Sequence, residues 1–122
     1  MAKQRRLRAG CGIGAAVVAL VCFAPLSGAA SAAAGGDPQL AEGRALFTAG
    51  ATPPCAICHS LKDAGATGAV GPALDELQPD EERVAAAVRG GIGAMPSFAA
   101  TLTDAQIRAI ARYVAKASGG AH

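Results

Sequence analysis

The feature that most constrains this chain is the run Cys55-Ala56-Ile57-Cys58-His59. Two thiols three positions apart can reach the two vinyl groups on one edge of a porphyrin. The histidine beside the second thiol then lies under the ring, where an imidazole nitrogen can bind iron. Such a C-x-x-C-H run is typical of covalent haem attachment, and histidine is the commonest protein ligand of haem iron. The run therefore predicts one covalent haem c with His59 as an axial ligand.

Other uses of the same residues are less consistent with the rest of the chain. A thioredoxin-like redox pair would need a βαβ pattern around it, which is missing. A zinc site would need a second pair of ligands, and the remaining candidates are Cys11, Cys22 and the terminal His122. A structural disulfide would leave the adjacent histidine without a role.

Residues 1–32 are typical of an export signal. Four basic side chains precede an apolar run from Cys11 to Leu26, and small residues follow up to Ala30-Ser31-Ala32. This order predicts a signal peptide with an A-x-A cleavage site, and hence a periplasmic protein. A retained membrane anchor is the alternative, although a span needs about 20 apolar residues. Residues 33–122 then form one domain.

The charge and size of that domain limit its partners and its core. Without residues 1–32, seven basic and nine acidic side chains remain, a net charge of −2. No basic patch for nucleic acid is present. A domain of roughly 90 residues buries only a small core, and aromatic residues make up 3% of the chain. A covalent haem would supply the missing apolar mass and a staple.

The outer segments of the domain predict two helices. The first begins at Pro38 with Asp37 as its N-cap and runs to about Ala49, with Gly50 ending it. The last follows Thr103, whose pairing with Gln106 three residues later is a capping-box signature. Neither segment alternates polar and apolar residues as a strand would.

Shorter elements and loops are expected between them. Glycines and a proline predict a loop over 61–73, and a helical turn over 74–77 follows. Pro79 is expected at the first position of the next helix, which ends at Gly90-Gly91. Residues 91–98 then form an irregular loop. The domain is therefore predicted to be all-α, with three to four helices around the haem.

Two further residues are candidates for the iron site. Met95 lies on the irregular loop, where packing explains a methionine poorly, and a thioether is a suitable second axial ligand that raises the reduction potential. An open sixth iron position with Met95 as a neighbour is the alternative. The imidazole of His59 should donate its other N–H to an acceptor, and a backbone carbonyl in Gly71-Pro72 is close enough in sequence.

With these residues in place, the domain resembles the small bacterial class I c-type cytochromes over nearly its whole length. The matching positions are Gly43 and Phe47 of the first helix, the Cys55–His59 run, Gly71-Pro72-Ala73-Leu74, Met95-Pro96 and Tyr113. The resemblance implies that the Pro72 carbonyl accepts from His59, that Met95 binds the iron, and that the first and last helices cross near Gly43 and Tyr113.

The resemblance also implies the function. It indicates a periplasmic one-electron carrier, not an enzyme, that receives electrons from a dehydrogenase and passes them to an oxidase or another cytochrome. It implies no small-molecule substrate. The alternative is a ligand-binding or peroxidatic haem protein with an open sixth site. More narrowly, the runs Gly68–Leu77 and Gly91–Phe98 resemble those of cytochromes that accompany periplasmic sulfite dehydrogenases. Ala94 and Phe98 are expected to shield the Met95 side of the ring.

Overall fold

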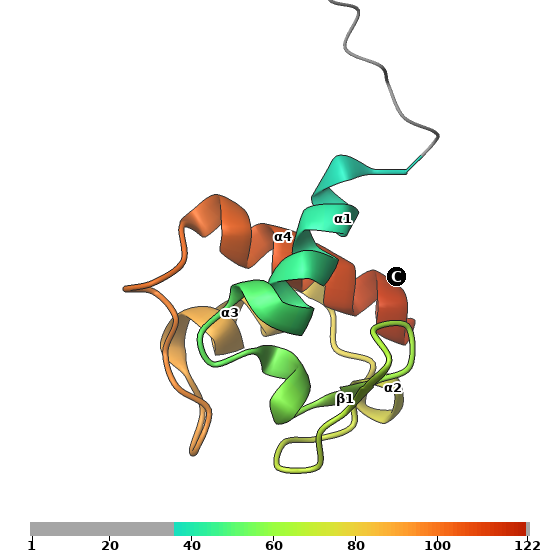
Figure 1. Ribbon diagram of the computed structural model, residues 1–122, viewed down its shortest axis with the longest axis horizontal. Helices are drawn as coiled ribbons and strands as arrows, with labels where there is room; N and C mark the ends of the chain where they lie inside the picture. Colours follow the sequence, from blue (N-terminus) through green and yellow to red (C-terminus); the bar gives the residue numbers. More distant parts are fainter. Residues whose placement is uncertain (1–35, 122) are drawn as a thin grey trace, which may run out of the picture. The chain divides into compact units, whose positions relative to one another are not determined.

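The computed structural model describes residues 36–121, so the predicted signal peptide over 1–32 lies outside the described residues. Helices dominate the described part (Figure 1). Its α-helices are α1 Pro38–Ala45, α2 Leu74–Leu77, α3 Glu81–Gly90 and α4 Asp104–Ser118. Within these residues no helix is long and apolar enough to cross a membrane. The all-α prediction is confirmed.

The first helix begins as predicted but ends differently. The Asp37 carboxylate accepts from the backbone N–H of Gln39 at 3.0 Å, and Pro38 occupies the first turn. The α-helical hydrogen bonds stop at Ala45, and the final turn, Leu46–Gly50, is a π-helix. A π-turn is wider than an α-turn. Here the consecutive side chains of Leu46 and Phe47 are both buried.

Helices α1 and α4 cross at close range, and Figure 1 shows α1 lying over the middle of α4. A Cβ atom added to Gly43 would overlap the backbone carbonyl of Ala109 and lie 2.7 Å from the Cβ of Tyr113. Only glycine permits this approach. Beside it the rings of Phe47 and Tyr113 meet edge to face, with centroids 6.1 Å apart. The predicted crossing near Gly43 and Tyr113 is confirmed.

Helix α4 supplies the largest part of the core. Thr103 and Gln106 form the predicted capping box at its start. Ile107, Ile110 and Val114 are almost completely buried along one face. Because these apolar residues recur every three or four positions, the helix presents one continuous stripe to the rest of the domain.

Helix α3 begins two residues later than the sequence predicts. Pro79 is not its first residue: Asp80 is the N-cap, and its carboxylate accepts from the backbone N–H of Arg83 at 2.7 Å. A helix that began at Pro79 would have Gln78 as its N-cap, whereas Asp is one of the preferred N-cap residues. Pro79 is buried and precedes the helix. The predicted end at Gly90 is confirmed.

The loop over 61–73 contains a small antiparallel ribbon that the sequence did not predict. Strands β1, Ser60–Leu61, and β2, Ala66–Thr67, pair with Leu61 opposite Ala66. Two-residue strands carry too few positions for an alternating pattern to be recognised. A 3₁₀ turn spans Cys55–Ile57, and β1 begins directly after His59, so the ribbon continues the chain from the C-x-x-C-H run.

Candidate functional site

A cavity of about 460 Å³ lies inside the described domain, and all five site residues predicted from the sequence line it. They are Cys55, Cys58, His59, Pro72 and Met95. They come from three separate segments: the 3₁₀ turn and its sequel, the loop before α2, and the loop after α3. A cavity of this size is in the range that holds a single organic cofactor.

The C-x-x-C-H segment is folded back on itself by backbone hydrogen bonds. The N–H groups of Cys58 and His59 both donate to the carbonyl oxygen of Cys55, at 3.1 and 2.9 Å. Cys55 and Cys58 are both free thiols and partly buried. Burial raises the pKa of the Cys55 thiol to about 11, so this thiol is protonated at neutral pH. Cys55 thus presents a neutral thiol on one wall of the cavity, and the Cys58 thiol lines the same cavity.

The imidazole of His59 is held by the segment that precedes α2. Its Nδ1 lies 3.0 Å from the carbonyl oxygen of Pro72. The carbonyl can only accept, so Nδ1 is the donor, and in the neutral imidazole Nε2 is then the nitrogen with the free lone pair. A Cβ atom on Gly71 would lie 2.7 Å from Nδ1 and 2.9 Å from Nε2. Glycine is therefore required there for the imidazole to occupy this place.

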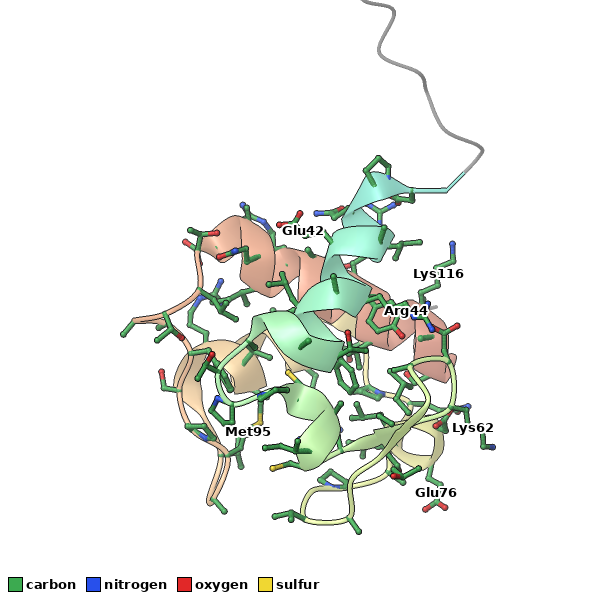
Figure 2. The ribbon with its side chains drawn as sticks, in the orientation of Figure 1. Glu42, Arg44, Lys62, Glu76, Met95 and Lys116 are labelled. Carbon is green, nitrogen blue, oxygen red and sulfur yellow. The ribbon has the colours of Figure 1, made fainter. Side chains whose placement is uncertain are left out.

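Met95 lies on a loop that is fixed at both ends. Ile92 and Met95 exchange two backbone hydrogen bonds, of 3.1 and 2.9 Å, which close a tight turn. The N–H of Phe98 donates to the carbonyl of Val88 at 2.9 Å, tying the loop to α3. Figure 2 shows Met95 on the inner side of the loop, and its side chain is half-buried. Ala94 and Phe98 line the same cavity, as the shielding prediction requires.

The remaining walls are almost entirely apolar. They include Val84 and Val88 of α3 and Val114 of α4. Among the residues that line the cavity, Arg83 is the one arginine, lysine, aspartate or glutamate. No local sequence pattern marks Arg83 as a site residue, because it directly follows three acidic residues at the start of α3.

A polar cluster outside the cavity joins α1, α4 and the ribbon. The Tyr113 hydroxyl donates to the Asp63 carboxylate at 2.6 Å, and Arg44 donates to the Asp63 carbonyl at 3.0 Å. Figure 2 shows Arg44 at this junction. Burial and the hydrogen bond to the Asp63 carboxylate raise the pKa of Tyr113 to about 12. Fifty residues separate Asp63 from Tyr113, so no local pattern indicates the pair.

These observations fit a haem attached through two thioether bonds. Cys55 and Cys58 stand beside an apolar cavity with His59 adjacent, and the Pro72 carbonyl leaves the Nε2 lone pair of His59 unused within the domain. The thioether of Met95 is a second neutral donor suited to haem iron. The donor set of imidazole and thioether, together with apolar walls, is the chemistry that such a group needs.

Comparisons with known proteins agree with this fit. The chain matches the family model described as Cytochrome C oxidase, cbb3-type, subunit III, over residues 38–114. It is similar to the crystal structure of the c-type cytochrome SorU from Sinorhizobium meliloti, with 52% sequence identity and a TM-score of 0.65. That match covers 69% of this chain and 95% of SorU. A search of curated protein sequences gives no significant match.

Proposed function

Because this chain belongs to the c-type cytochrome family and so has one covalent haem c, we propose that it is a periplasmic one-electron carrier with His59 and Met95 as axial ligands. The observation that carries the proposal is that both side chains line the one cavity that also holds the two thiols. If both side chains held the iron, no position on it would remain for a substrate. The protein would then transfer electrons without catalysing a reaction of its own.

When bound, the haem supplies a reversible one-electron change at its iron. The chain's own residues would keep the structural change that accompanies electron transfer small. The Pro72 carbonyl accepts from Nδ1 of His59 at 3.0 Å and so fixes the ring and its tautomer. The anchored loop holds Met95 in place through the hydrogen bonds of Ile92 and Phe98. The apolar lining would keep water away from a bound haem, which would lower the cost of reorganisation when the charge of its iron changes.

We propose a sulfite dehydrogenase as the electron donor. The support is the likeness of two runs, Gly68–Leu77 and Gly91–Phe98, to those of cytochromes that accompany such enzymes. Both runs contribute residues to the cavity, among them Pro72, Leu77 and Met95. The likeness therefore concerns the surroundings of the haem rather than a distant part of the surface. The acceptor would be an oxidase or a further cytochrome.

The test is reduction of the purified ferric holoprotein by periplasmic extract of the host, followed by haem absorbance. Candidate substrates are added one at a time, with sulfite first, and samples without extract serve as controls. We expect fast reduction that needs both sulfite and extract. Reduction by another substrate alone would keep the carrier and discard the sulfite pathway. No reduction by any extract or membrane fraction would contradict the carrier proposal itself.

A further inference from the structure

Arg83 stands out because a cation lines a cavity whose other walls are apolar. It lies in the first turn of α3, and Ala87, one turn further along the same face, also lines the cavity. Its backbone N–H donates to the Asp80 cap at 2.7 Å. An arginine stem can cover apolar surface, but its guanidinium needs five hydrogen-bond acceptors or water. Arg83 is exposed, so it lies at the mouth of the cavity, where either water or an anionic group of a bound molecule can accept from it.

No protein group in the described residues supplies that acceptor. Arg44, Arg89 and Arg112 each form an ion pair with an aspartate, at 3.8, 2.8 and 2.7 Å. Within residues 36–121, the guanidinium of Arg83 makes neither an ion pair nor a hydrogen bond. This holds although Arg83 follows directly on three acidic residues.

Those three acidic residues face cationic side chains of α4. Asp80, Glu81 and Glu82 line a second depression together with Arg112 and Lys116 of α4. Arg83 does not line that depression but lines the apolar cavity instead. The cations near residues 80–82 are therefore those of α4, and Arg83 faces the cavity instead.

A haem c has two propionate carboxylates, and these must be placed when it enters the cavity. Placing an unpaired carboxylate against apolar walls is unfavourable. A guanidinium is a matched partner, since its parallel N–H groups bind both carboxylate oxygens at once. We propose that Arg83 is the residue of this chain that pairs with a haem propionate.

Such a pair also affects the iron. Ferric haem carries one more positive charge than ferrous haem, so a nearby cation disfavours the ferric form and raises the reduction potential. The proposal rests on the haem c and not on the carrier function. A potential measured on the isolated holoprotein therefore tests it whichever partner the protein serves.

The experiment compares Arg83→Gln, Arg83→Lys and Arg108→Gln as purified holoproteins. Each reduction potential is measured by spectroscopic titration from pH 5 to pH 8. Arg108 is the matched control because it is exposed, lies on α4 away from the cavity, and loses the same charge on substitution. Thermal unfolding of each variant checks that the fold is retained.

We expect Arg83→Gln to have a lower potential than the wild type, with a gap that widens as the pH rises. The reason is that a propionate without its cation has a raised pKa. It is neutral at pH 5, where the gap is small, and negative at pH 8, where the gap is full. Arg83→Lys should restore most of the potential, and Arg108→Gln should follow the wild type.

Three results would each overturn the proposal. One is an Arg83→Gln potential equal to that of the wild type at every pH. Another is an equal fall in Arg83→Gln and Arg108→Gln, which would reflect net charge alone. The last is a gap that stays constant from pH 5 to pH 8, which would indicate a structural effect. If Arg83→Gln did not fold, Arg83→Lys would decide. A reduction potential equal to that of the wild type, together with no nuclear magnetic resonance contact between residue 83 and a propionate, would overturn the proposal.

Discussion

At the scale of single residues, Asp63 connects the segment that holds the thiols to the helix crossing. Its carboxylate accepts from the Tyr113 hydroxyl at 2.6 Å, and its carbonyl accepts from Arg44 at 3.0 Å. Asp63 follows β1, only four residues after His59. Tyr113 is 4% exposed, so its hydroxyl depends on Asp63 for a partner. The cluster therefore ties the position of the C-x-x-C-H run to α1 and α4.

This cluster predicts a loss of stability at high pH. The pKa of Tyr113 is raised from 10.0 to about 12 in the folded state. Below pH 10 both states are protonated and the hydrogen bond contributes in full. Between pH 10 and about 12 only the unfolded state loses its proton, so stability falls as the pH rises.

The measurement is denaturant unfolding at intervals from pH 7 to pH 12. The wild type should lose stability above pH 10, and Tyr113→Phe should lose less over the same range because it has no hydroxyl to titrate. At pH 7 the variant should be less stable by about 0.5–1.5 kcal/mol, the usual worth of one hydrogen bond. Parallel pH profiles for both proteins would show that Tyr113 does not titrate as stated.

The sequence patterns predict some residues of the site and miss others. Cys55, Cys58 and His59 are adjacent in sequence, and Met95 stands out as a methionine on a glycine-rich loop. The structure brings all four to one cavity. The Asp63–Tyr113 pair and the placement of Arg83 depend on how helices are packed. No spacing along the chain encodes them.

At the scale of elements, the crossing of α1 and α4 sets the frame around the cavity. Gly43 allows the α1 backbone to approach Ala109, and Phe47, one turn further on, lines the cavity. Val114 reaches the same cavity from α4. Any separation of these two helices would therefore also change the shape of the cavity.

Gly43→Ala is expected to destabilise the protein even though alanine favours helices by about 1 kcal/mol over glycine. The added Cβ would overlap the Ala109 carbonyl, and overpacking of this kind costs about 1–3 kcal/mol net. The control is Gly90→Ala, where a Cβ meets nothing within 4 Å. It should change stability by less than about 0.5 kcal/mol. Equal effects on the melting temperature would contradict the close crossing.

The boundaries of the helices are predicted well where one local signal is present and less well where two signals compete. The capping box of Thr103 and Gln106 was predicted because both partners are local. The start of α3 was misplaced because Pro79 and Asp80 are both good starting residues, and the Asp80 side chain prevails as the cap. The π-turn at Leu46–Gly50 depends on burying two neighbouring side chains, which is a tertiary effect.

At the scale of the whole domain, the cavity takes a large share of a small interior. The fully buried large side chains of the described residues are Phe47, Leu61, Ile107, Ile110 and Val114. A core this small gives limited stability by itself. Val84, Val88 and Phe98 belong to the core cluster and also line the cavity. The haem is thus expected to complete the core as well as to carry the electron.

Cys55→Ala/Cys58→Ala, which cannot form either thioether bond, should therefore be much less stable than the holoprotein. The expected loss is about 3 kcal/mol or more, because each apolar side chain that the haem covers contributes about 1.5–3 kcal/mol. Circular dichroism melting should show a fall of about 12 °C or more. Cys55→Ala, which keeps one thioether, should lie between the two. A double variant that melts with the holoprotein would contradict the structural role of the haem.

The measurement that most directly tests the account is carbon monoxide binding to the reduced holoprotein, with Met95→Ala alongside. If His59 and Met95 fill both axial positions, the wild type should show no rapid change in haem absorbance. Met95→Ala should bind carbon monoxide rapidly and should have a lower reduction potential. Rapid binding by the wild type, at a rate like that of Met95→Ala, would contradict the carrier account and indicate an open iron site.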